Sequence, residues 1–598
     1  MSIDESSILT EEFIKNGTAL FGMGMYDELA QICREFLKTD KNDQVYSMLA
    51  SAEFSLGETQ AAEESVRKGL EINPSNPDLL YNLACILQNK NLISNAVRYF
   101  ARAEKACTSE EYKDLPDYIE LAGLCRSEIN RLIKILEKNE NEIIPQKAEK
   151  RVLIVAAVYP PLSGSGIQRT AKLVKFLRLY GWEPVVITPA TKTDTVFSDG
   201  KYFDELPDDI EVLRIPQKKS AAASDVDYMM SKVSQMLSEP MAKQLEYYYD
   251  KLDIEKRFAL CSFPESLVFW AAQIADNLNK YLDVSTIDAV YSTSGPYSDH
   301  VAGYYIKKLY NIPWVADFRD EWSKNPFIWP DKEYIHYRMC VDCEQTIFKF
   351  ADHIVFVTER SCENGIELGL PGEKVSCITN GYDEEDFEWF ENNSVRNEKF
   401  TIVHNGLTYA GRTTITIAEA LKNLIDKGEI DRNKIILHMG HSSGESEKED
   451  LDKAIKSFGL ENIAIHNPYM DHHDSIVHTS TADLLLLLLG ESDEYSATYP
   501  GKIFEYLRFN KPILSLGPHG SISENLLQRT GHGVNVNYND IAGIEKEILR
   551  FYNMWEKQSD GISSAILTKE KTFDISVYER RHLASKHAGI FDKISENI

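Results

Sequence analysis

Hydrophobic and polar positions follow two different periods along this chain. Up to about residue 140, apolar side chains recur every three or four residues, which predicts amphipathic helices. From residue 152 onward, short continuous apolar runs alternate with amphipathic stretches, as expected of buried parallel strands joined by helices. The pattern therefore predicts an all-α region followed by α/β structure.

The helical region contains a repeat of 34 residues. Residues 42–74 are followed by residues 76–107, and a shift of 34 places Leu49 on Leu83, Ala50 on Ala84, Ala62 on Ala96 and Val66 on Phe100. This alternation of small and large positions resembles tetratricopeptide repeats, and residues 16–37 resemble a degenerate earlier copy. We expect three repeats and capping helices within residues 1–145. Such a solenoid would bind a protein on its concave surface, or act as a spacer or dimerisation element.

Two series of apolar runs divide the remainder of the chain. The first starts at residues 152–158 and continues through 185–188 and 287–293. The second starts at 400–406 and includes the six consecutive leucines of 484–489. Two doubly wound α/β domains in tandem predict a ligand cleft beside the carboxyl ends of their strands.

Composition and charge narrow the class of partner. The 598 residues include 65 lysines and arginines against 93 aspartates and glutamates, a net charge of −28. This argues against nucleic acid or an anionic membrane surface as the main partner, although a local basic cleft could coexist with the acidic total. The leucine run is too short to cross a bilayer, and we see no secretory signal. With nine scattered cysteines, these features predict a reduced, cytoplasmic protein without a transmembrane segment.

Two short patterns could be mistaken for metal sites. Cys340 and Cys343 form a lone C-x-x-C without a second pair of ligands. The sequence DHHD at residues 471–474 lies where an exposed, charged turn is expected. We predict a metal site at neither.

Five motifs occur in the order and spacing of one enzyme family. They are YPPLSGSGIQRTAKLVKFL (159–177), VADFRDEW (315–322), ITNGYDEEDF (378–387), VHNGLTYAGR (403–412) and PGKIFEYLRFNKPI (500–513). Together they resemble the two-domain GT-B glycosyltransferases, specifically the retaining family 4 type of bacterial surface-polysaccharide and protein-glycosylation systems.

The resemblance covers residues 150–598 and implies a domain organisation. Residues 150–395 would form an N-terminal Rossmann-like domain on the acceptor side, and residues 396–575 a C-terminal one on the nucleotide-sugar side. Residues 576–598 would form a helix that crosses back to the first of these domains. In the motif at 378–387, Asn380 and Gly381 are expected to shape the turn between the domains.

The resemblance also implies a donor site. A nucleotide-sugar, expected to be UDP-linked, would be held without a metal cofactor by backbone N–H groups, cations and helix N-termini. Arg412, Gly501 and Lys502 would face its diphosphate, and Glu505 would accept hydrogen bonds from ribose hydroxyls. Gly164 and Gly166 would lie near the donor phosphates or the acceptor.

The residues themselves support part of this assignment and leave alternatives open. Lys502 and Glu505 share one face of a helix's first turn, where a lysine opposes the helix dipole unless an anion is bound. The alternatives are a solvated surface pair for these two and a loop arginine for Arg412. Family 4 usually has a glutamate where this chain has Ala497, and its lysine after Arg412 is not evident.

The other edge of the predicted cleft carries DFRDEW. Asp317, Arg319 and Asp320 follow a strand, and the resemblance implies that Asp320, then Arg319, lies beside the transferred sugar or acceptor. Asp320 would orient groups, because retaining transfer is often argued to use the donor phosphate as the proton acceptor. A structural Asp–Arg pair is the alternative. Gln168 and Arg169 could also reach the cleft. His300 is expected to be a cap or packed residue.

The favoured function is a glycosyltransferase acting on a protein held by the helical repeats. A lipid-linked glycan is the alternative acceptor. The alternatives to the transferase are a nucleotide-sugar 2-epimerase of the same fold, and a non-catalytic repeat scaffold on a degenerate transferase fold.

Overall fold

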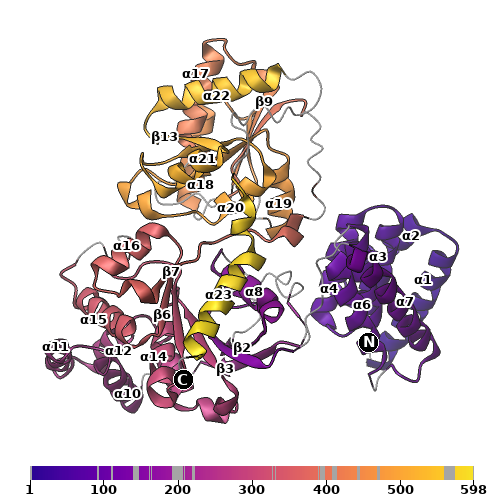
Figure 1. Ribbon diagram of the computed structural model, residues 1–598. Coiled ribbons are helices and arrows are strands. Elements are labelled where there is room, and N and C mark those ends of the chain that lie inside the picture. Colours follow the sequence, from indigo (N-terminus) through magenta and orange to yellow (C-terminus); the bar gives the residue numbers. More distant parts are fainter. Residues whose placement is uncertain are drawn as a thin grey trace. The chain divides into compact units, whose positions relative to one another are not determined.

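The computed structural model of the chain comprises two compact units, Met1–Ile144 and Pro145–Ile598 (Figure 1). The first unit is built from helices, and the second contains two parallel sheets with their helices. The structure describes residues 3–90, 93–109, 112–138, 147–160, 162, 165–190, 206–207, 209–217, 222–325, 328–329, 332–387, 390, 397–406, 414–440, 445–467, 470, 472–557 and 573–596.

Helical hairpins repeat along the first unit. Asn42 and Asn76, 34 positions apart, each accept a hydrogen bond from the backbone N–H three residues later, at 3.1 and 3.0 Å. These N-caps start two helices in the same phase. The eight side chains that the sequence shift aligns are all buried, at 4% exposure or less. The described helices are α1 (Ile3–Gly22), α2 (Tyr26–Phe36), α3 (Asp43–Ser55), α4 (Thr59–Ile72), α5 (Pro77–Asn89), α6 (Ile93–Cys107) and α7 (Pro116–Lys138).

The first sheet of the second unit is parallel, with strand order β3-β2-β1-β4-β5-β6-β7. Its strands are β1 (Lys150–Val155), β2 (Trp182–Ala190), β3 (Glu211–Pro216), β4 (Ala289–Thr293), β5 (Trp314–Phe318), β6 (His353–Phe356) and β7 (Val375–Cys377). The helices that accompany it are α8 (Ser165–Leu177), α10 (Ala223–Ser234), α11 (Glu239–Tyr249), α12 (Ile254–Cys261), α13 (Val268–Asp276), α14 (Ser298–Tyr310), α15 (Ile335–Phe350) and α16 (Glu359–Glu367).

The second sheet is also parallel, with strand order β10-β9-β8-β11-β12-β13. Its strands are β8 (Phe400–Val403), β9 (Ile435–Met439), β10 (Ala464–His466), β11 (Leu484–Leu488), β12 (Ile513–Leu516) and β13 (Gly533–Val536). Its helices are α17 (Ile415–Asp426), α18 (Glu445–Ser457), α19 (His472–Ser480), α20 (Lys502–Phe509), α21 (Ile522–Thr530) and α22 (Ile541–Glu556).

Both sheets are doubly wound. The direction of winding reverses between β1 and β4 in the first sheet and between β8 and β11 in the second. All five leucines of β11 are buried, because helices cover both faces of a parallel sheet. The predicted fold class, two Rossmann-like domains preceded by an all-α tetratricopeptide-like solenoid, is confirmed.

The last helix of the chain packs on the first sheet. Figure 1 shows this helix, α23 (Arg580–Ser595), in yellow beside α8. Leu583 and Phe591 belong to the apolar core around β1, and the Phe591 ring lies 5.3 Å from that of Trp182. At the rim of this contact, Lys150 forms an ion pair with Asp592 at 2.7 Å.

Residues 378–387, the connecting segment, run from the first sheet toward the second. The N–H of Tyr382 donates to the carbonyl of Tyr578 at 3.1 Å, and the N–H of Arg580 donates to the carbonyl of Tyr382 at 2.7 Å. A Cβ at Gly381 would collide with the carbonyl oxygen of Tyr578. The structural role predicted for Gly381 is therefore confirmed, since only glycine allows this close approach.

The C-x-x-C pattern belongs to the packed core. Cys340 and Cys343 lie on α15, and both are buried within the apolar cluster of the first sheet. Burial raises the pKa of both thiols, which keeps them neutral. Among the helices that the structure describes, none combines the length and the apolar character needed to span a membrane.

Candidate functional site

Lys502 begins α20 at the carboxyl edge of the second sheet. Its Nζ donates to the carbonyl of Asn405, two residues after β8 ends, and its side chain is half-buried. Burial lowers the pKa of Lys502, and the charge of Glu505 opposes that shift. At Gly501 no described atom lies within 4 Å of the position that a Cβ would take. A half-buried cation beside a helix N-terminus forms an arrangement suited to an anion.

Glu505 lies one turn further along α20 and contacts a histidine. Its Oε1 is 2.9 Å from Nε2 of His472, the first residue of α19, and the two side chains are 16% and 14% exposed. Burial alone would raise the pKa of Glu505, but the hydrogen bond and charge of His472 and the charges of Lys502 and Arg580 lower it. Glu505 is therefore an anion that is held in place and still reached by solvent.

The end of β8 is tied to the same two helices. The side-chain amide of Asn405 donates to the carbonyl and hydroxyl oxygens of Ser475 on α19, both at 2.7 Å. Nδ1 of His404 lies 3.0 Å from the carbonyl oxygen of Leu486 on β11. Residues 404–406 and the first turns of α19 and α20 thus gather at one place, which we call the second-sheet edge.

The contacts exclude one alternative for the two residues of α20. Lys502 contacts Asn405 and Glu505 contacts His472, and no hydrogen bond or ion pair of the described residues joins Lys502 to Glu505. Both side chains are half-buried. The interpretation of Lys502 and Glu505 as a solvated surface pair is wrong.

The predicted residues of the first sheet meet at its carboxyl edge. Gly166 is the second residue of α8, the helix that follows β1, Gly295 follows β4 and Arg319 follows β5. The Arg319 guanidinium donates to the carbonyl of Gly295 at 3.2 Å and fills the space that a Cβ of Gly166 would need. Nε of Arg319 is 3.6 Å from a carboxylate oxygen of Asp320, whose side chain is 57% exposed. Gly166, Arg319 and Asp320 are therefore neighbours.

A buried ion pair lies directly behind this edge. Arg169 on α8 donates two hydrogen bonds to Asp317, at 2.6 and 2.8 Å, and one to the carbonyl of Thr379 at 2.9 Å. The hydroxyl of Tyr291 donates to Asp317 as well. Burial alone would raise the pKa of Asp317, but the charge and hydrogen bonds of Arg169 lower it. The expectation that Arg169 reaches the cleft is wrong, because its guanidinium is buried in this pair.

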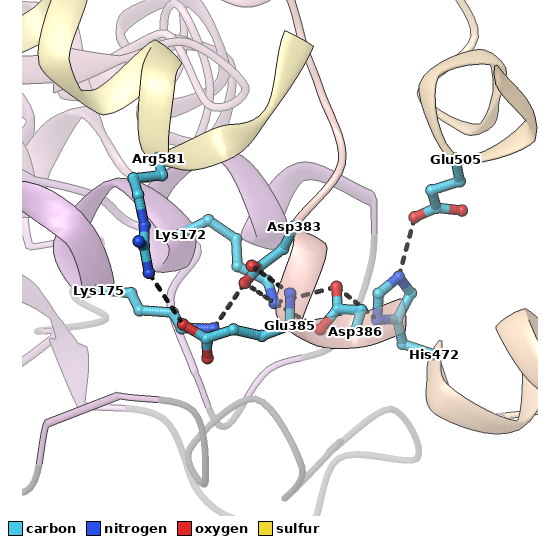
Figure 2. A network of polar contacts seen from close by, with 8 residues as sticks. All are labelled: Lys172, Lys175, Asp383, Glu385, Asp386, His472, Glu505 and Arg581. Carbon is cyan, nitrogen blue, oxygen red and sulfur yellow. Dashed lines mark hydrogen bonds and ion pairs between the residues drawn. The ribbon is translucent and has the colours of Figure 1, made fainter. Parts of the chain in front are cut away.

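Charged side chains join α8 to the connecting segment and to α19 (Figure 2). Lys172 pairs with Asp383 at 2.7 Å and with Asp386 at 2.9 Å, while Lys175 pairs with Asp383 at 2.6 Å. The series continues from Asp386 to Nδ1 of His472 at 4.0 Å, and from His472 to Glu505. Glu385 also contacts Lys175 at 2.6 Å and Arg581 at 4.0 Å.

Sequence reasoning missed most of this network. The DHHD motif was expected to be an exposed turn, whereas His472 begins a helix and is nearly buried. Lys172 and Lys175 resemble a solvated helix face in the sequence, yet both side chains are only 2% exposed. Two lysines three residues apart in the apolar stretch AKLVKFL (171–177), together with the acidic run DEED, were the available signal.

Three further residues were singled out in the sequence: Gly164, Arg412 and His300. Gly164 and Arg412 lie outside the described residues, so their roles stay predictions. His300 is buried on α14, with Nδ1 2.8 Å from the hydroxyl of Ser292, and burial lowers its pKa to about 3. It is a packed residue, as predicted. Among the described residues, no group of three or more His, Cys, Asp or Glu side chains could hold a metal ion.

Comparison with known proteins supports the architecture. The tetratricopeptide repeat family matches residues 43–76, the α3–α4 hairpin. A search of curated protein sequences gave no significant match. Among solved structures, sucrose-phosphate synthase from Thermosynechococcus elongatus aligns with a TM-score of 0.50 and 12% identity, covering 75% of this chain and 100% of that chain.

Two further solved structures align over a similar share of the chain. For a glycosyltransferase from Rickettsia africae ESF-5, the TM-score is 0.49 and the identity 13%, over 75% of this chain and 100% of that chain. For Anabaena HepE in complex with UDP and glucose, the values are 0.46 and 14%, over 74% and 100%. The likeness to the synthase shows the fold: this chain combines a two-domain GT-B fold with an N-terminal tetratricopeptide repeat region.

Proposed function

We propose that this chain is a glycosyltransferase that moves a sugar from a UDP-linked donor to an acceptor hydroxyl. The observation that carries the proposal is a half-buried cation and a half-buried carboxylate, Lys502 and Glu505, on the first turn of α20 at the second-sheet edge. Ligands of doubly wound sheets bind at the carboxyl ends of the strands, next to the point where the winding reverses. β8, which leads to Asn405, is one of the two strands at that point.

The chemistry of the donor matches these side chains. Negative charge develops on the diphosphate as the bond to the sugar breaks, and fixed positive charge stabilises it. Lys502 and the N-terminus of α20 would bind the diphosphate, together with Arg412, which follows β8. Glu505 would accept hydrogen bonds from two ribose hydroxyl groups, because a carboxylate can accept from two O–H donors at once. With these groups supplying the charge, the proposed transfer needs no metal ion.

The carboxyl edge of the first sheet would receive the acceptor. Arg319 is held between Gly166 and Gly295, and the carboxylate of Asp320 beside it is exposed to solvent. We assign Asp320 and Arg319 to orienting the acceptor hydroxyl and the transferred sugar. A retaining transfer of the family 4 type would let the donor phosphate take the proton of the acceptor hydroxyl on the same face of the sugar.

Nucleotide binding provides the direct test of this proposal. The full-length protein is expected to melt at a higher temperature with UDP or a UDP-sugar, since a ligand at 100 times its Kd stabilises the folded state by about 2.7 kcal/mol. Incubation of the protein with UDP-sugars should then release free sugar slowly without an acceptor. Interconversion of donors would indicate an epimerase instead. Failure of UDP, GDP and ADP alike to shift the melting temperature would support a non-catalytic scaffold.

The helical unit would select the acceptor. Residues 1–144 form their own compact unit, and stacked helical repeats present an extended concave surface for a protein. Deleting residues 1–144 is expected to leave UDP-sugar hydrolysis within about twofold, because the proposed donor residues all lie in the second unit. Transfer to a protein acceptor, measured by mass spectrometry of the glycosylated product, should be lost. Unchanged transfer would contradict the recruitment role.

A further inference from the structure

His472 occupies a central position between the connecting segment and the second-sheet edge. Its Nε2 lies 2.9 Å from Glu505 on α20, and its Nδ1 lies 4.0 Å from Asp386. Figure 2 shows the imidazole ring between these two carboxylates, which come from segments more than a hundred residues apart. The ring is nearly buried, so both contacts are shielded from water.

We infer that His472 is a positioning residue: as an imidazolium it fixes the Glu505 carboxylate for the ribose and couples Glu505 to the connecting segment through Asp386. The inference rests on the proposed function, because it takes Glu505 as the ribose-binding group. Nε2 is within hydrogen-bond distance of Glu505, whereas Nδ1, at 4.0 Å, is at ion-pair distance from Asp386. A protonated ring carries a positive charge that attracts both carboxylates, and a neutral imidazole carries none.

The charges around the ring favour the doubly protonated form. Burial alone would lower the pKa of His472, but the hydrogen bond and charge of Glu505 and the charge of Asp386 raise it to about 9. Lys172 on α8 opposes this shift, and it is itself paired with Asp386. The charges of Lys502 and Arg580 lower the pKa of Glu505, which keeps this partner of His472 ionised. The imidazolium therefore persists at pH 7 and is lost as the pH rises through about 9.

This coupling has a consequence for the nucleotide. Asp386 belongs to the connecting segment, and Lys172 on α8 contacts it there. Glu505 lies on α20, a helix of the second sheet. A carboxylate held by His472 keeps its orientation before the ribose arrives, so less order has to be created on binding. Glu505 without this partner could still bind ribose, but more weakly.

The test compares UDP affinity of full-length wild type and His472→Gln between pH 7 and 9.5, by calorimetry. Glutamine can still donate to Glu505 but carries no charge. We expect His472→Gln to bind UDP about tenfold more weakly at pH 7, since coupled residues of one network show effects of this size. The ratio should fall toward about threefold by pH 9.5, because about three quarters of the wild-type rings have then lost their proton. Titration of UDP itself affects both proteins equally and cancels in the ratio.

A second measurement needs no ligand. The ring resonance of His472, assigned by its absence in His472→Gln, should titrate near pH 9 in the NMR spectrum of the free protein, and Asp386→Asn should lower that midpoint. His519→Gln is the matched control, because His519 is 64% exposed and lies 3.6 Å from the carboxylate of Glu524. This control should leave UDP affinity unchanged.

The outcomes separate the two proposals. A His472 ring that titrates near 6.5 overturns the inference whether or not UDP binds. Equal UDP affinity of wild type and His472→Gln at every pH also overturns it. Failure of the wild type to bind UDP, GDP or ADP overturns the proposed function, and the inference with it, even if the ring titrates near pH 9.

Discussion

Replacing Asp317 with alanine is expected to destabilise the second unit by about 3–5 kcal/mol, because it leaves Arg169 as a buried cation without its carboxylate. Arg169 and Asp317 are 2% and 0% exposed, so water cannot replace the lost partner. The effect should appear as a lower midpoint of the second unit's transition in chemical denaturation. Nucleotide binding should be reduced only to the extent that the protein unfolds, since neither side chain is among those proposed to bind the nucleotide.

Two further variants show whether this loss comes from the unpaired charge. Combining Arg169→Met with Asp317→Leu removes both charges and should recover most of the stability, since apolar residues often replace a buried pair without loss. Glu239→Ala removes a partner of Lys243 from a pair that is 79% and 71% exposed, and it should change stability by less than about 0.5 kcal/mol. An Asp317→Ala protein as stable as Glu239→Ala would contradict the assignment.

The fold was predictable because its signals are local. The shift of 34 residues aligns Asn42 with Asn76, and each side-chain amide oxygen caps the helix that follows it. The continuous leucines of β11 indicate a strand covered on both faces, which is the hallmark of a parallel sheet. Period and run length are properties of neighbouring residues, so they can be read without knowing which distant segments meet.

The site was less predictable because its contacts are between distant residues. The sequence indicated Lys502 and Glu505 through the motif they share, but not that they contact Asn405 and His472, respectively. Arg169 was expected at the cleft because it begins a helix after a glycine-rich loop. The side chain instead pairs with Asp317, 148 residues away, and spacing carries no information about such a partner. Which charged side chains form a pair depends on how distant segments of the chain pack together.

Alanine at Lys502 or Glu505 should weaken UDP binding by about ten- to a hundredfold, because each variant removes a hydrogen bond of a charged group to the ligand, worth roughly 1.5–3 kcal/mol. Calorimetry with UDP measures this loss. The melting temperature of free Lys502→Ala should change little, because the hydrogen bond of Lys502 to the described residues is to a backbone carbonyl, that of Asn405. Glu505→Ala also removes the partner of His472, so its melting temperature should fall about as far as that of His472→Gln, which lacks the same pair.

The comparison between binding and folding decides what these side chains are for. Loss of a residue that serves only stability would weaken UDP binding no further than the loss of folded protein explains, whereas loss of a ligand contact lowers the UDP affinity of protein that is still folded. Lys434→Ala, which breaks an exposed pair with Glu556 in the same half of the unit, provides the baseline for a lysine without a ligand. If Lys502→Ala and Glu505→Ala bind UDP as tightly as Lys434→Ala does, the start of α20 does not bind the nucleotide, and the proposed donor site must be abandoned.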